Sequence, residues 1–120
     1  GKELILQLKK EIMRDAKANK NLEKLISIVD SEGIQVDKLI KPIQEIREIA
    51  KEEKDPLVTR ALRLAWQHIE ANQSFGIPLA EEIENETENL SYFLSLCIKN
   101  ENEFNREDLR EMTNNLQELA

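Results

Sequence analysis

The segment from Asp55 to Ile69, DPLVTRALRLAWQHI, constrains the fold most, because its apolar residues recur at helical spacing. Asp followed by Pro is a helix start: the carboxylate accepts from free N–H groups of the first turn, and Pro has no N–H to leave unpaired there. The apolar residues cover roughly 200° of the helix surface. We therefore expect two or more neighbouring helices to cover this one, with Arg60 and Arg63 on its polar side.

This segment also carries the only Trp and the only His of the chain, Trp66 and His68. Trp66 is predicted to anchor a core or an interface, with its N–H in need of a partner, and ligand stacking is the alternative. His68 lies on the apolar side of the helix, which favours a buried imidazole with one hydrogen-bond partner. A pH-sensitive role stays open because His titrates near neutrality.

Helical spacing continues before the central segment. It predicts a first helix over residues 3–18, a break at Lys20 and Asn21, and a short second helix that Gly33 closes in the left-handed conformation. A third helix is predicted to begin at Asp37 and to bend at Pro42; the alternative is a separate turn, with Pro42 opening the main helix. The short connection KEEKD then favours an antiparallel hairpin with the central helix.

After the central segment, residues 72–77 form the clearest loop, and Phe75 and Ile77 are expected to tuck under it. The next helix is predicted over residues 78–99, and Asn105 is the expected cap of the last helix. The chain is thus predicted to be a single domain over residues 1–120, an all-α, mainly antiparallel bundle of about six helices without a β-sheet.

The composition agrees with this fold class, since 34% of the 120 residues are charged and only three are Gly and three Pro. Gly1 precedes a helical pattern directly, so we expect a cloning remnant and a piece of a longer protein. One Cys cannot form an internal disulfide, and Cys97 lies in an apolar run typical of a buried, inert thiol. No apolar run reaches the roughly 18 residues of a membrane span, so a cytoplasmic protein is expected.

The charge is uneven along the chain. Residues 1–60 carry 13 Lys and Arg against 12 Asp and Glu, whereas residues 61–120 carry 4 against 12. An acidic half repels nucleic-acid phosphates, so neither nucleic acid nor membrane is a predicted partner. A basic face on the first helix is a candidate patch for an acidic partner, with a merely solvated face as the alternative; its residues are Lys9, Lys10, Arg14 and Lys17, with Lys20 and Lys24.

The acidic run AEEIENETENL is the strongest candidate for chemistry. Glu81, Glu84 and Glu88 share one side of a helix, and such carboxylates can hold Mg²⁺ or Mn²⁺. Glu81-x-x-Glu84 resembles the first half of the metal-binding pattern of all-helical nucleotide pyrophosphohydrolases. The second half, Glu-x-x-Asp on the following helix, is not found, and a solvated face is the favoured interpretation.

Glu86 falls inside the apolar stripe of its helix. We expect it either to face solvent beyond the core or to pair with His68, Arg60 or Arg63.

No catalytic residue and no cofactor is predicted, because the chain lacks a Gly-rich phosphate loop and a recognisable nucleophile–His pair. The favoured function is a non-enzymatic protein–protein interaction or regulatory domain that binds a partner helix or associates with itself. Alternatives are the metal-dependent enzyme and an acidic inhibitor that masks a basic protein. The candidate partner-binding residues are Tyr92, Leu96, Leu109, Met112, Leu116 and Leu119, and Leu6 and Met13 add apolar surface.

Overall fold

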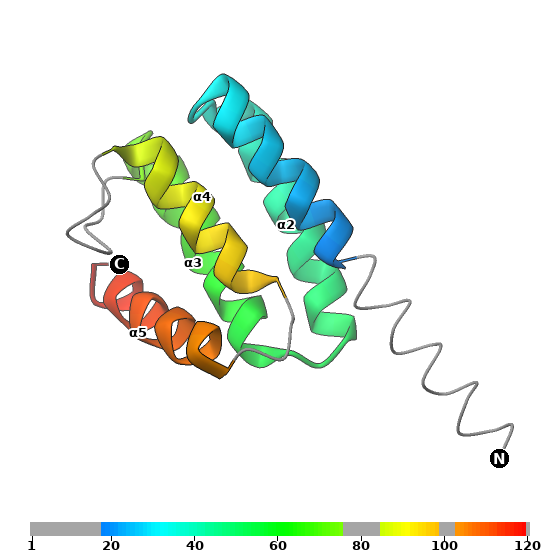
Figure 1. Cartoon of the computed structure of the whole chain (residues 1–120). Coiled ribbons are helices and arrows are strands. Elements are labelled where there is room, and N and C mark those ends of the chain that lie inside the picture. Colours follow the sequence, from blue (N-terminus) through cyan, green and yellow to red (C-terminus); the bar gives the residue numbers. More distant parts are fainter. Residues whose placement is uncertain (1–17, 76–84, 99–102, 120) are drawn as a thin grey trace, which may run out of the picture.

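The computed structural model describes residues 18–75, 85–98 and 103–119, which form five helices and no strand. The helices are residues 18–32, α2 (Val36–Glu52), α3 (Pro56–Asn72), α4 (Glu86–Cys97) and α5 (Glu103–Leu119) (Figure 1). The all-α fold class is confirmed, with five helices in these ranges where about six were expected. The helix predicted over residues 3–18 lies almost entirely outside them.

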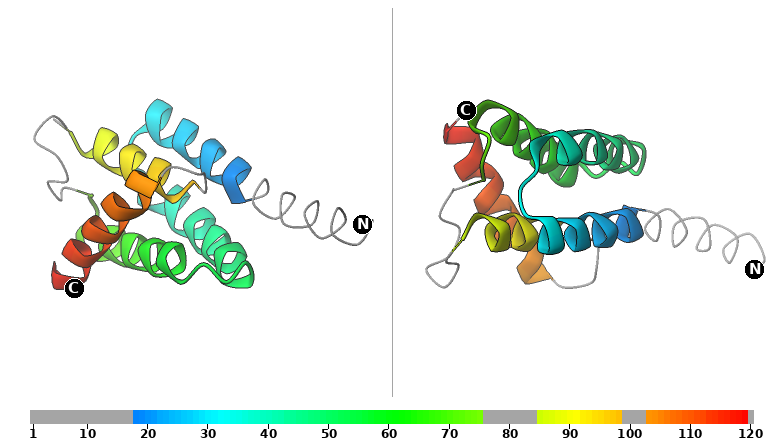
Figure 2. Two further views of the ribbon diagram at one scale, coloured as in Figure 1. Left: turned by 60° about the horizontal axis from the view of Figure 1, so that its bottom comes forward. Right: turned by 90° about the horizontal axis from the view of Figure 1, so that it is seen from above.

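The helices lie in two layers (Figure 2). The helix over residues 18–32 and α4 lie in one layer, and α2 and α3 lie in the other. Helix α5 crosses at one end and contacts α3 and α4, which belong to different layers. A hydrogen bond of 2.7 Å from the Ser91 hydroxyl to the Asp30 carboxylate joins the two helices of the first layer.

Leu and Ile from every described helix fill the space between the layers, as the small number of aromatic residues predicts. Burying one such side chain contributes about 1.5–3 kcal/mol, so the core is the main source of stability. The largest fully buried side chains are Phe75, Phe93, Leu22, Leu25, Leu39, Ile43, Leu62, Ile69, Leu90, Leu94, Leu109 and Leu116.

Helices α2 and α3 form the predicted antiparallel hairpin, and the start of α3 is as predicted. Asp55 accepts a hydrogen bond from the Val58 N–H at 3.3 Å, and Pro56 is the first helical residue. The turn is tight because Lys54 adopts a left-handed φ of 57° and the Asp55 N–H donates to the Ala50 carbonyl at 3.0 Å. The hairpin therefore brings the outer faces of two helices close together.

The predicted break at Lys20 and Asn21 is wrong, because residues 18–32 form one continuous helix. Ala18, Leu22 and Leu25 are all buried, so one apolar stripe runs straight through the polar residues between them. Gly33 closes this helix as predicted: its φ is +75° and its N–H donates to the Val29 carbonyl at 2.8 Å.

The third predicted helix does run through Pro42, but Asp37 is not its cap. Helix α2 begins one residue earlier, at Val36, and its N-cap residue Gln35 makes no side-chain capping bond. Asp37 instead lies in the first turn, where a negative charge interacts favourably with the helix dipole.

The predicted starts of the last two helices are also wrong. Asn85 has an extended backbone and caps α4 by accepting from the Glu88 N–H at 2.9 Å, so no single helix runs over residues 78–99. Helix α5 begins at Glu103, which places Asn105 inside the helix rather than at its cap. Both errors concern helix ends, where short polar residues offer several competing caps.

The prediction for the loop after α3 is confirmed at Phe75, whereas Ile77 lies outside the described residues. Phe75 is fully buried, with its ring centroid 5.5 Å from that of Phe93. Its carbonyl accepts a hydrogen bond of 2.9 Å from the buried amide of Asn89. In the described ranges, none of the helices combines the length and apolar character needed to cross a bilayer.

Candidate functional site

A surface groove of about 590 Å³ lies along the α2–α3 hairpin. Its volume falls in the range of ligand-binding pockets. Helix α2, the turn and α3 all contribute to its lining: Arg47, Lys51, Lys54, Asp55, Pro56, Thr59, Arg60 and Arg63. Five of these eight residues are Lys or Arg, although the whole chain carries a net charge of −7. The groove is therefore a local concentration of positive charge on an acidic protein.

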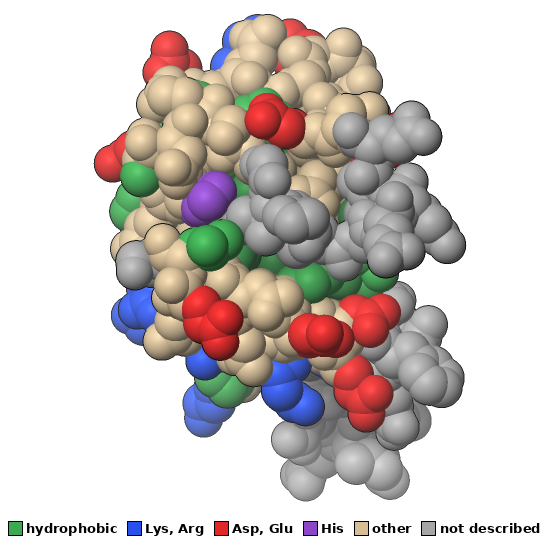
Figure 3. Space-filling model, turned by 90° about the vertical axis from the view of Figure 1, so that its left-hand side faces the viewer, with side chains coloured by type: hydrophobic (Ala, Val, Ile, Leu, Met, Phe, Trp, Pro, Cys, Tyr) green, Lys and Arg blue, Asp and Glu red, His purple; other side chains and the backbone are tan. Residues whose placement is uncertain are grey.

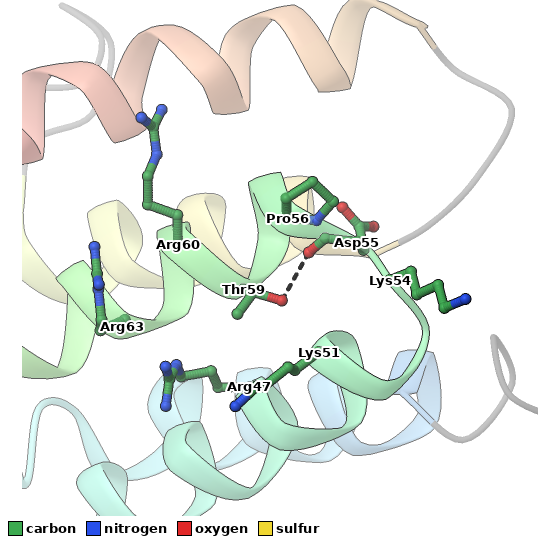
Figure 4. Close-up of a pocket in the computed structure, with 8 residues that line it drawn as sticks. All are labelled: Arg47, Lys51, Lys54, Asp55, Pro56, Thr59, Arg60 and Arg63. Atoms are coloured by element: carbon green, nitrogen blue, oxygen red, sulfur yellow. Dashed lines mark hydrogen bonds between the residues drawn. The ribbon is translucent and has the colours of Figure 1, made fainter.

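The hairpin geometry explains this concentration. Arg47 and Lys51 are one turn apart on α2, and Arg60 and Arg63 are three residues apart on α3, so each pair lies on one side of its helix. The tight turn at Lys54 places α3 beside α2, so both basic pairs line the same groove (Figure 4). Arg60 points away from α2 toward α5, whereas Arg47 and Lys51 extend from α2 toward the groove (Figure 4).

Most of the positive charge in the groove is not neutralised. Arg47 has one weak contact, a distance of 3.4 Å to the carboxylate of its exposed neighbour Glu48. Within the described ranges, Lys51, Lys54 and Arg63 form no ion pair at all. Cations gathered without counter-charges repel one another, and an anion in the groove relieves that repulsion.

Two guanidinium nitrogens are also withdrawn from water without an acceptor. The Nε atoms of Arg47 and Arg63 are buried and have no hydrogen-bond partner among the described residues. A buried, unpaired donor costs free energy, most of all on a charged group. A hydrogen-bond acceptor close to either Nε atom would therefore stabilise that arginine.

The single carboxylate of the lining, Asp55, does not neutralise these cations, because Arg106 of α5 binds it. The two Nη atoms of Arg106 donate to the two carboxylate oxygens at 3.0 and 2.7 Å. Thr59 donates its hydroxyl proton to the Asp55 backbone carbonyl at 2.7 Å, as the dashed line in Figure 4 shows. The lining of the groove near the turn is thus fixed by polar contacts within the protein.

The structure divides the predicted partner-binding residues into two groups. Leu96, Leu109, Met112 and Leu116 lie in the core of this chain, where α4 and α5 contact each other, so their side chains are not accessible to a partner in this structure. Tyr92 and Leu119 do reach the surface, and Leu119 is 61% exposed. A partner-binding role for these two stays a prediction. Leu6 and Met13 lie outside the described residues.

Tyr92 contacts α5 through its hydroxyl. Burial raises the pKa of Tyr92, and the carboxylate of Asp108 raises it further by its charge and by a hydrogen bond with the phenol. The residue therefore links α4 to α5 as well as reaching the surface.

The candidate metal site lies mostly outside the part of the chain that the structure describes. Glu81 and Glu84 lie outside it, and Glu88 is exposed in the first turn of α4. No group of three His, Cys, Asp or Glu side chains in the described ranges is arranged to hold a metal ion. Glu86 faces solvent, the first of its two expected alternatives.

His68 lies at the surface in Figure 3, on a face with scattered acidic side chains. It is half-buried, and its Nδ1 lies 3.2 Å from the Asn72 amide nitrogen. Its ring meets Phe75 edge-on with 5.8 Å between centroids. Burial lowers the pKa of His68. The expected polar partner is present, but the imidazole is half-buried rather than buried as expected.

Cys97 and Trp66 are structural residues in this fold. Cys97 is fully buried, and burial raises the pKa of its thiol, in agreement with an inert side chain. Trp66 packs against the core and is partly exposed. Its indole N–H, which was expected to need a partner, is buried and has none among the described residues.

Sequence reasoning missed the groove. The sequence pattern predicts Arg60 and Arg63 on the polar side of α3, and its candidate basic patch lies on the first helix instead. Residues 9–17 of that patch lie outside the described ranges, and Lys20 and Lys24 are exposed. The available signal was the Arg47/Lys51 spacing combined with the predicted hairpin, which together place four cations on adjoining faces.

Comparisons with protein-family models, with curated proteins and with solved structures found no match for this chain. The groove and its contacts are therefore the basis for assigning a function.

Proposed function

We propose that this domain is a protein-interaction module that binds an acidic segment of a partner protein in the groove between α2 and α3. The observation that carries the proposal is the set of five Lys and Arg side chains around a groove whose single lining carboxylate is bound by Arg106. Arginine binds carboxylates with two parallel hydrogen bonds and is enriched among residues that dominate interface affinity.

An acidic helix fits the groove better than a long polyanion does. Arg47 and Lys51 are one helical turn apart, so carboxylates spaced by four residues on a bound helix can face both. A nucleic acid extends well beyond the groove and meets a chain of net charge −7, which repels it.

The single buried Cys97 also supports our expectation of a cytoplasmic protein.

The proposal is tested with a fluorescein-labelled 15-residue peptide of Ala with Glu at every fourth position, titrated by anisotropy. We expect binding that weakens with added salt, because the contacts are electrostatic. A peptide with Gln in place of Glu is expected not to bind. A second copy of this chain is the other possible occupant of the groove, and light scattering of the free protein detects it as a dimer. A dimer that dissociates when Arg47 and Arg63 are both replaced by Glu would contradict the proposal.

A matched pair of charge reversals locates the site. Arg47→Glu with Arg63→Glu removes two groove cations and is expected to weaken binding by about tenfold or more. Lys20→Glu with Lys24→Glu makes the same change in net charge on the exposed face of the helix over residues 18–32. Equal losses from both double variants would mean that overall charge, not the groove, holds the peptide, and the proposal would fail.

A further inference from the structure

Arg60 belongs both to the groove and to the contact with α5. It is one of the residues that line the groove. Its guanidinium also donates to the side-chain oxygens of Asn114 at 2.9 Å and of Gln117 at 3.2 Å. These two residues are one turn apart on the second half of α5, so one cation of the groove clamps the end of that helix.

We propose that the acidic segment in the groove and the second half of α5 compete for the guanidinium of Arg60, so that α5 regulates the affinity of the groove. This inference rests on the proposed function and adds a regulatory element to the same site. A carboxylate in the groove can accept two parallel hydrogen bonds from Arg60 and adds the attraction of opposite charges, whereas the side-chain amides of Asn114 and Gln117 are neutral acceptors. We therefore expect a carboxylate of the bound segment to replace Asn114 and Gln117 as the acceptor of the Arg60 guanidinium.

Releasing Arg60 from α5 costs little. Asn114 and Gln117 are exposed, so water replaces the guanidinium at their oxygens. The first half of α5 keeps its own anchor, because Arg106 stays bound to Asp55. The exchange thus loosens residues 114–119 without detaching the helix, and by linkage anything that releases those residues strengthens binding in the groove.

The test uses the Glu-bearing peptide and the double variant Asn114→Ala with Gln117→Ala. Removing both acceptors frees Arg60, and we expect the affinity for the peptide to rise roughly two- to tenfold. The control variant is Gln67→Ala with Asn115→Ala, on α3 and α5. Both side chains are exposed, and neither makes a side-chain hydrogen bond in the described ranges. Its affinity is expected to equal that of the wild type.

Two further measurements separate competition from a general loosening of α5. In an Arg60→Ala background, the Asn114/Gln117 double variant is expected to leave the affinity unchanged, because the shared group is gone. Hydrogen exchange of the backbone amides of residues 114–119 is expected to become faster in the wild type when the peptide binds. An affinity gain that persists without Arg60 would overturn the inference.

The failure of this inference is distinguishable from failure of the proposed function. If the wild type binds the peptide and R47E/R63E does not, but N114A/Q117A binds as the wild type does, the groove stands and the competition is refuted. If the wild type does not bind the peptide at all, both the proposed function and the proposed competition for Arg60 are refuted.

Discussion

Arg106 holds Asp55 through two parallel hydrogen bonds, and Asp55 at the same time caps α3. The Nη atoms donate at 3.0 and 2.7 Å, while the Asp55 carboxylate also accepts from the Val58 N–H. The pair is largely withdrawn from water, with the side chains of Arg106 and Asp55 29% and 13% exposed. One carboxylate therefore fixes the start of α3, part of the lining of the groove and the first half of α5.

Substitutions at Asp55 should separate these roles. Asp55→Ala loses both the cap and the charge-assisted bonds, and we expect it to lower the free energy of unfolding by roughly 2–4 kcal/mol. Asp55→Asn keeps a capping oxygen and should cost about half as much. Urea denaturation followed by circular dichroism measures both, with the exposed Glu70→Ala as a control expected within about 0.5 kcal/mol of wild type. Equal costs for Ala and Asn would show that the cap contributes nothing.

Replacing Gln73 by Gly should stabilise the domain. Gln73 ends α3 with a left-handed φ of 58°, a conformation that a residue with a Cβ adopts only at a cost. Gln73→Gly is expected to raise stability by up to about 1 kcal/mol. Gln67→Gly, in the exposed interior of the same helix, should instead lower it by a similar amount. The melting temperatures of the two variants should therefore move in opposite directions.

The indole N–H of Trp66 should contribute little to stability, because it has no acceptor among the described residues. We expect Trp66→Phe to stay within about 1 kcal/mol of the wild type, since it removes an unpaired donor along with some apolar area. Trp66→Ala should cost about 2 kcal/mol or more. Circular dichroism has to follow the unfolding, because these variants lack the only Trp. A Phe variant as unstable as the Ala variant would argue for an acceptor that the indole depends on.

His68 should make stability fall as the pH drops. Burial lowers its pKa in the folded state, so below the ordinary value of about 6.5 the unfolded chain binds the proton more readily. Its contribution is fully present above that value and is lost as the pH falls through the lower, folded value. We expect the stability difference between the wild type and His68→Gln to shrink from pH 7.5 to 5.5 in urea denaturation. A difference that grows over this range would reverse the assigned direction.

The elements that the sequence predicts well are those that local signals define. Asp55 and Pro56 specify the start of α3, and the short connection before them specifies the hairpin. Ala18 and Leu22 show the opposite case: the stripe that joins them is buried by distant helices, so the polar residues between them looked like a break. Asn85 is one of several polar residues in an acidic run, and only the folded chain shows which one caps α4.

The groove was not predicted because its charge comes from two helices at once. Arg47 and Arg63 each look like ordinary surface residues on their own helix, and only the packing of α2 on α3 makes them neighbours. The narrow seam of Leu109, Met112 and Leu116 is ambiguous in the sequence for a related reason. A stripe of that width is compatible with burial against the same chain or against a partner, and the structure has it buried within the chain.

Because α5 contacts both layers, its buried apolar residues complete the core. Leu109, Met112 and Leu116 fill space that α3 and α4 leave between them, so without α5 the apolar faces of both helices would be exposed to water.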